Sequence, residues 1–145
     1  MSRRSIYDKT EGGLGGDRKA PLSHMKKLSP QELDSLKREA KLLIPERVRY
    51  FAAKLGITYG RISIRAQRSR WGSCSSKGNL NFNCLLMLTP REAIDSVIVH
   101  ELCHRRELNH SKAFWALVYE AMPDYKVWDK WLKDHGRELI SLLPK

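Results

Sequence analysis

The 145-residue sequence has few cysteines and no long apolar segment. Its three cysteines, an odd number without paired spacing, argue against a disulfide scaffold and favour a reducing compartment. No uncharged apolar run is long enough to span a bilayer, so no membrane partner is expected. The basic start of the chain is not followed by the apolar stretch of a signal peptide. We therefore expect a cytoplasmic protein.

Acidic residues are also scarce, since 16 of them face 27 basic residues and the net charge is +11. A solvated basic surface is the simplest interpretation of this excess. The alternative is attraction to an anion, such as a nucleic acid, a nucleotide or a phosphorylated substrate. Charge alone identifies a partner only weakly, and both interpretations stay open.

The first part of the chain, residues 1–28, holds several glycines and lacks apolar periodicity. We expect a flexible tail over 1–28, followed by a single domain over 29–145. A capping box, Ser29-Pro-Gln-Glu32, predicts that a helix begins there, and apolar residues at helical spacing continue it. Pro45 is expected to kink this helix, and Gly56 to end it.

Two short strands are predicted next. Ile62 and Ile64 alternate with polar residues, and residues 79–84 alternate asparagine with apolar side chains. A polar loop lies between them, and we expect the two strands to pair as an antiparallel hairpin.

A second capping box, Thr89-Pro-Arg-Glu92, opens another helix, for which Asn109 is a suitable left-handed stop. Ser111 caps a further helix, and a last helix follows residues 123–124.

The strongest chemical signal is the segment His100-Glu-Leu-Cys-His104 inside the second capped helix. Residues four apart share one helical face, so both imidazoles can bind one metal ion. Glu101 lies on the flank, where its carboxylate can take a proton from a metal-bound water without binding the metal. This is the pattern of a zinc hydrolase.

A third histidine, His110, follows after the predicted stop of that helix. Catalytic zinc usually has three protein ligands and one open position, so His110 completes the set if the chain turns back beneath the helix. The alternative is that His110 only flanks the next helix. The predicted cofactor is one Zn²⁺ per chain.

The loop region 61–78 holds basic residues and no acidic one. It either binds an anionic substrate or forms a solvated strand edge whose charges prevent aggregation with other strands. Trp71 is a core anchor for this loop or a platform on which a base stacks. The strand over 79–84 can hold an extended peptide by backbone pairing. The candidate substrate-binding residues are Arg65, Arg68, Arg70, Trp71 and Asn81.

Several segments together resemble the YgjP-like metallopeptidase family, whose domain is related to SprT-like and Spartan-type zinc proteases. They are Ser69-Arg-Trp-Gly-Ser-Cys-Ser75, Gly78-Asn-Leu-Asn-Phe82, residues 97–104, Asn109-His-Ser111 and Phe114-Trp115. The resemblance covers roughly residues 45–140. It implies a minimal zincin-like α+β fold, in which a small antiparallel sheet lies beside an active-site helix with further helices packed around it. It also implies zinc bound by His100, His104 and His110, with Glu101 as catalytic base. Many members carry a longer, strand-rich N-terminal region, whereas this sequence offers a glycine-rich tail and one long helix there.

The sequence therefore predicts a zinc-dependent hydrolase, foremost a metallopeptidase. Its expected substrate is a peptide or protein, and the net charge of +11 is compatible with one that is anionic or associated with DNA. One alternative is a metal-dependent hydrolase of nucleotides or other phosphoanhydrides, in which the basic loop binds phosphate. A second alternative is a nucleic-acid-binding module with a structural zinc site, which would bind DNA in a salt-sensitive way without turnover.

Overall fold

A computed structural model describes residues 26–144, so residues 1–25 of the expected tail lie outside it. The helices are α3 (Pro30–Leu55), α4 (Arg91–Cys103), α5 (Lys112–Ala121) and α6 (Tyr125–Ile140). The strands are β1 (Ile62–Arg65), β2 (Gly72–Cys74) and β3 (Leu80–Asn83), and the short 3₁₀ helix η2 (Cys84–Leu88) connects β3 to α4. The α+β class is confirmed. Among these helices none is both long and apolar enough to cross a membrane.

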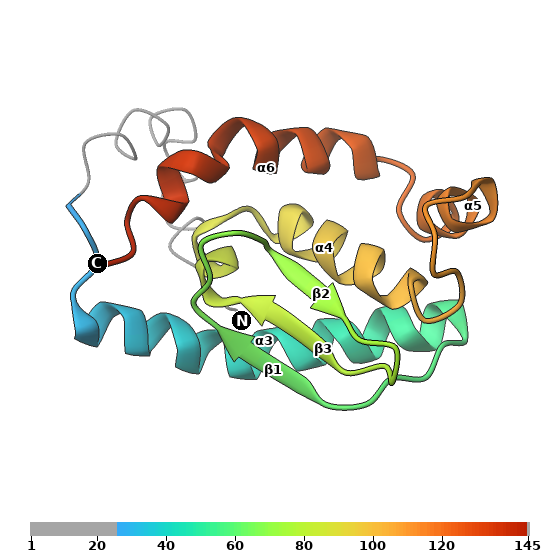
Figure 1. Cartoon of the computed structure of the whole chain (residues 1–145), viewed down its shortest axis with the longest axis horizontal. Coiled ribbons are helices and arrows are strands. Elements are labelled where there is room, and N and C mark those ends of the chain that lie inside the picture. Colours follow the sequence, from blue (N-terminus) through green and yellow to red (C-terminus); the bar gives the residue numbers. More distant parts are fainter. Residues whose placement is uncertain (1–25, 145) are drawn as a thin grey trace.

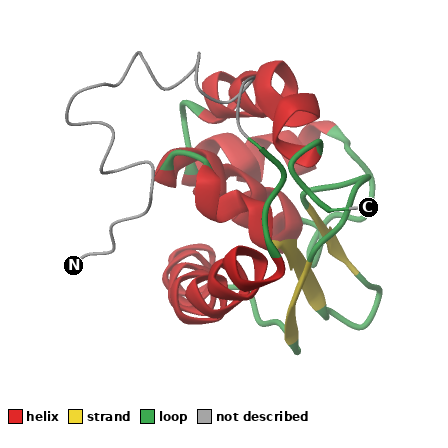
Figure 2. Ribbon diagram, turned by 90° about the vertical axis from the view of Figure 1, so that its left-hand side faces the viewer, coloured by secondary structure: helices red, strands yellow, loops and turns green. Residues whose placement is uncertain are grey.

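The centre of the molecule is α4, which lies between α3 and α6 and contacts both (Figure 1). The strands gather on one side of the helices, where α3 contacts β1 and α4 contacts β2 (Figure 2). Large side chains from every layer are fully buried between them, including Ile44, Phe82, Ile98, Phe114 and Leu139. Burial on several sides fixes the position of α4.

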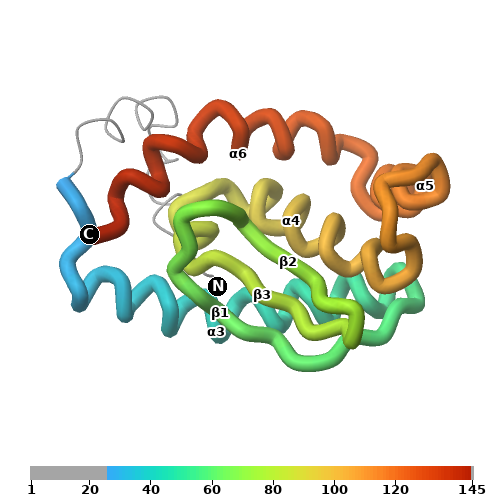
Figure 3. The backbone as a smooth tube through the Cα atoms, in the orientation of Figure 1, coloured from blue at the N-terminus to red at the C-terminus, as the bar shows by residue number. Residues whose placement is uncertain are grey.

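The first helix forms as predicted at both ends. The Ser29 hydroxyl accepts from the backbone N–H of Glu32, and the Glu32 carboxylate accepts from the N–H of Ser29 at 2.8 Å, which completes the capping box. α3 continues through Pro45 and ends at Gly56, whose φ of 69° is left-handed. The N–H of Leu28 donates to the carbonyl of Leu142, so the start of α3 lies beside the end of the chain (Figure 3).

The sheet is mixed, with the order β1-β3-β2. β1 pairs with β3 in parallel, Ile62 opposite Leu80, whereas β2 pairs with β3 in antiparallel, Gly72 opposite Phe82. The predicted antiparallel hairpin of the first and last strand is therefore wrong. Part of the predicted loop forms β2 and turns back at Gly78, whose φ is 87°, so β2 takes one edge of β3 and leaves the other to β1.

Two predictions at the ends of α4 are also wrong. The helix is capped by Pro90 without a side-chain bond, because the Thr89 hydroxyl donates instead to the Leu86 carbonyl of η2 at 2.7 Å. The helix ends at Cys103, and within residues 26–144 no residue other than glycine has a positive φ, so Asn109 is not left-handed. Right-handed turns that bond back to the Cys103 carbonyl carry the chain onward instead.

Candidate metal centre

Two of the three candidate ligands sit at the C-terminal end of α4. His100 lies in its last turn, and His104 is the residue that caps it. Their ring centroids are 4.9 Å apart, as expected for residues four positions apart on one helical face. The rest of α4 is anchored in the core, so the protein fixes this pair of imidazoles before any ligand binds.

The third candidate, His110, is placed by the loop between α4 and α5. Arg105 donates to the Thr58 carbonyl, and Arg106 donates to the carbonyls of Leu55 and Gly56 at the end of α3. These bonds tie the loop to the body of the domain. The Ser111 hydroxyl then accepts from the Phe114 N–H and starts α5, as predicted.

The structure brings these three histidines together. Each offers a ring nitrogen, and these atoms all lie within 4.8 Å of one another. Nε2 of His110 is 3.3 Å from Nε2 of His100. Two nitrogen ligands of a tetrahedral metal ion at bonds of about 2.0–2.1 Å lie about 3.3–3.4 Å apart. The donor set and its spacing therefore fit a metal ion.

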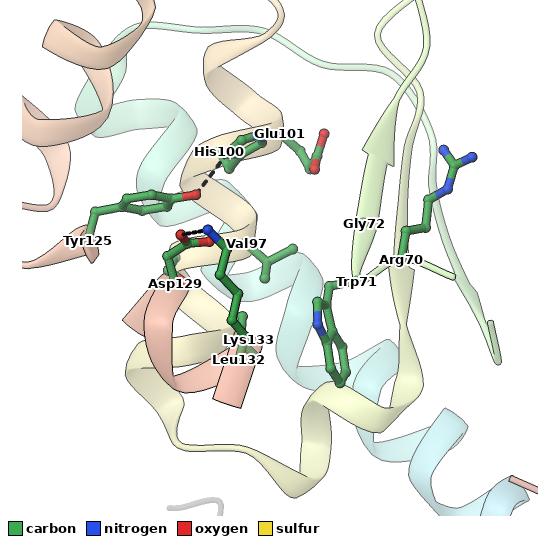
Figure 4. A pocket seen from close by; sticks show the side chains of 11 residues that line it. Arg70, Trp71, Gly72, Val97, His100, Glu101, Tyr125, Asp129, Leu132 and Lys133 are labelled. Carbon is green, nitrogen blue, oxygen red and sulfur yellow. Dashed lines mark hydrogen bonds and ion pairs between the residues drawn. The ribbon is translucent and has the colours of Figure 1, made fainter. Parts of the chain in front are cut away.

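The other ring nitrogens have partners on the protein. Nδ1 of His104 lies 3.1 Å from the Glu107 carbonyl, which can only accept, so this nitrogen carries the proton and Nε2 keeps its lone pair. Nδ1 of His100 lies 2.9 Å from the Tyr125 hydroxyl at the start of α6 (Figure 4). Such outer contacts fix the tautomer and the ring orientation of metal-binding histidines.

Burial shapes the electrostatics of the cluster. Burial first, and then the nearby His104 and His110, lower the pKa of His100 to about 4, so His100 is neutral at physiological pH. Only a neutral imidazole can bind a metal. Burial also raises the pKa of Glu101 to about 7, against the opposing effect of Arg70. Burial is likewise the main reason that the pKa of Tyr125 is raised.

Glu101 lies where α4 meets β2, and Gly72 allows this close approach. A Cβ at Gly72 would lie 2.9 Å from Cγ1 of Val97 and 3.2 Å from Cγ of Glu101. Any larger residue would push the strand from the helix. The Glu101 side chain is thus held between the helix that carries the histidines and the neighbouring edge strand.

A cavity of about 290 Å³ opens beside Glu101 and His100. Residues of β2 and the segment before it form one wall, α4 forms the floor and α6 forms the opposite wall (Figure 4). Two predicted substrate-binding residues, Arg70 and Trp71, line this cavity.

The other predicted substrate-binding residues do not line the cavity. The Asn81 amide accepts from Arg65 and donates to Ser73, and Arg68 donates to the Pro144 carbonyl. Sequence reasoning missed the contribution of α6, namely Tyr125, Asp129, Leu132 and Lys133. These residues lie more than 20 positions after the histidine pair, and no spacing pattern links them to it.

A small α+β domain that gathers three histidines and a buried glutamate at the end of one helix has the features of a metallohydrolase. The family model described as "YgjP-like, metallopeptidase domain" matches residues 16–135 of the chain. The chain therefore belongs to the YgjP-like metallopeptidase family, as its motifs predicted. Membership defines it as a metallopeptidase, whose substrate is a peptide or protein.

Two solved structures are similar in fold, each a crystal structure of a metallopeptidase zymogen. Abylysin of Pyrococcus abyssi is 20% identical with a TM-score of 0.59, and the match covers 66% of this chain and 97% of that one. Jannalysin of Methanocaldococcus jannaschii is 20% identical with a TM-score of 0.52, covering 63% and 95%. At this identity the likeness establishes the fold. Among curated proteins no match was found.

Proposed function

We propose that the protein is a zinc peptidase in which His100, His104 and His110 hold one Zn²⁺ and Glu101 is the general base. The observation that carries this proposal is the convergence of three imidazole nitrogens within 4.8 Å of one another, with the buried Glu101 on the same helix. Three histidine ligands leave a fourth tetrahedral position open, which distinguishes a catalytic zinc site from a structural one.

A zinc ion bound there would supply Lewis acidity, which polarises the scissile carbonyl and makes a water molecule easier to deprotonate. Glu101 accepts the proton that the water loses as its oxygen bonds to the carbonyl carbon. The same carboxyl gives this proton to the departing nitrogen as the C–N bond breaks, which regenerates the carboxylate. A pKa raised to about 7 suits a group that takes up and releases a proton near neutral pH.

We propose that the peptide lies along β2. This strand is an edge of the sheet, and Gly72 packs against α4 beside Glu101. A free strand edge binds an extended peptide through main-chain hydrogen bonds. The sequence suggested that the strand carrying Asn81 binds the peptide. That strand, β3, is the central one and is paired on both edges, so we assign peptide binding to β2 instead.

The charge distribution favours an anionic protein substrate, including one associated with DNA. No acidic residue occurs between Arg47 and Arg91, and Arg61, Arg65, Arg68 and Arg70 are exposed along the strands and the loop after β1. Such a surface attracts negative charge through a field that salt screens. Cleavage of an acidic protein should therefore slow as salt is raised, while cleavage of a short neutral peptide should change little.

The three free cysteines support a reducing cytoplasm as the location.

The proposal is tested by metal content and peptide turnover measured side by side. The wild type should hold about one zinc per chain, and His110→Ala should lose it. His135→Ala is the matched control, because His135 bonds to the Trp131 carbonyl outside the cluster and should retain zinc. Glu101→Gln should keep the metal and lose hydrolysis. Full activity of Glu101→Gln would disprove its role as base, and equal zinc in the two histidine variants would disprove the ligand set.

A further inference from the structure

The cavity beside Glu101 has apolar walls. Val97 of α4 lies on its floor, Leu132 of α6 on one side and the indole of Trp71 at the end away from His100 (Figure 4). Trp71 is itself supported from behind by Gly136, since a Cβ there would lie 3.5 Å from the indole ring. An apolar recess of this kind gains free energy when an apolar group displaces its water.

The cavity opens directly onto the reacting groups. Glu101 and His100 lie at one end, and Gly72 of the edge strand lines the same space. A peptide that follows β2 past Glu101 therefore carries one side chain over this opening. That side chain belongs to a residue next to the bond that is cut.

Two cationic side chains lie at the opening, besides the carboxylates of Glu101 and Asp129. Arg70 lines the strand side, while on the α6 side Lys133 is ion-paired with Asp129 at 2.9 Å. Asp129 is therefore already engaged by Lys133, and Glu101 is the other carboxylate among the residues that line the cavity. A lysine or arginine of the substrate would have to compete with Lys133 for Asp129.

We propose that this cavity binds a large apolar side chain, such as leucine, methionine or phenylalanine, of the substrate residue adjacent to the scissile bond. Trp71, Val97 and Leu132 set its shape, and Lys133 disfavours basic side chains by occupying Asp129. The inference rests on the proposed peptidase function and names its substrate class. A volume of about 290 Å³ lies just below the usual range for ligand pockets and suits one side chain rather than a whole cofactor.

The first test is the cleavage profile of the zinc-loaded wild type on a peptide library, with the cut sites read by mass spectrometry. Peptides with leucine, methionine or phenylalanine at one position beside the cut should have a kcat/KM at least about tenfold above those with lysine, arginine or glycine there. A flat profile at both neighbouring positions would overturn the pocket while leaving the peptidase function intact. No cleavage of any peptide would overturn both.

The second test exchanges the charge at the opening. Lys133→Glu breaks the ion pair with Asp129 and places two carboxylates beside the cavity. Lys130→Glu is the matched control, because Lys130 is paired with Asp134 on the same helix, is 74% exposed against 75% for Lys133, and does not line the cavity.

The measured quantity is the ratio of kcat/KM for a lysine peptide to that for the leucine peptide of otherwise equal sequence. Lys133→Glu should raise this ratio about tenfold at low salt, and Lys130→Glu should leave it at the wild-type value. An equal change in both variants, or none in Lys133→Glu, would overturn the assignment. Because both side chains are exposed and each change removes one ion pair of the same kind, folding affects both variants alike.

Discussion

The hydroxyl of Tyr125 lies 2.9 Å from Nδ1 of His100, although 25 positions separate the two residues in the chain. Tyr125 is the first residue of α6, so this bond connects that helix to the face of α4 that carries the histidines. It holds the His100 ring on the side opposite Nε2, the nitrogen that faces His110. The contact therefore orients a proposed metal ligand without touching the metal.

Tyr125→Phe should weaken zinc binding about 10- to 100-fold, because it removes the partner of Nδ1 while keeping the aromatic ring in place. Competition against a chromophoric chelator measures this affinity. Tyr119→Phe is the control, since the Tyr119 ring packs against Tyr125 but makes no hydrogen bond to a histidine of the cluster. If both variants bind zinc as the wild type does, Tyr125 has no positioning role.

Sequence reasoning reached the parts of the site that are local in the chain. His100, Glu101 and His104 are placed by one helical turn, and Ser111 by a cap, so spacing alone predicts them. The contacts of Tyr125 and Lys133 depend on how α6 packs on α4, which no periodicity encodes. The parallel pairing of β1 with β3 was missed for a similar reason: the alternation of Ile62 and Ile64 predicts a strand but not its neighbour.

Gly72→Ala should destabilise the protein by about 1–3 kcal/mol and reduce kcat, because the new Cβ would lie 2.9 Å from Val97 and crowd Glu101. Urea unfolding and peptide turnover measure the two effects. Gly136→Ala is the matched control: its Cβ would make an ordinary 3.5 Å contact with Trp71, and alanine favours the helix. Adding Val97→Ala to Gly72→Ala should relieve the clash, so the double variant should lose less stability than the sum of the single changes.

The ion pair of Arg47 and Asp95 joins α3 to α4 through two hydrogen bonds of 3.0 and 2.8 Å. Burial raises the pKa of Asp95, and Arg47 opposes that shift. Arg47→Met leaves the buried carboxylate unpaired and should cost about 3–5 kcal/mol near neutral pH.

The stability lost in Arg47→Met should be larger at higher pH. Without Arg47 the pKa of Asp95 rises further, so the folded state binds a proton more tightly than the unfolded chain. Stability then falls as pH rises through the folded pKa, and the deficit should be smaller at pH 5 than at pH 8. Arg49→Met, an exposed change on the same helix, should cost little at either pH. An equal deficit at both pH values for Arg47→Met would contradict this account of Asp95.

Removal of zinc should lower the melting temperature, because an ion that binds only the folded state stabilises it by mass action. With zinc at about 100 times its dissociation constant the gain is about 2.7 kcal/mol, which for a domain of this size corresponds to roughly 10 °C. Differential scanning calorimetry before and after chelation measures the shift. His110→Ala should show almost none, because two histidines from α4 alone bind zinc weakly, whereas His135→Ala should show the full wild-type shift. A full shift in His110→Ala would place the stabilising ion elsewhere and separate it from the cluster.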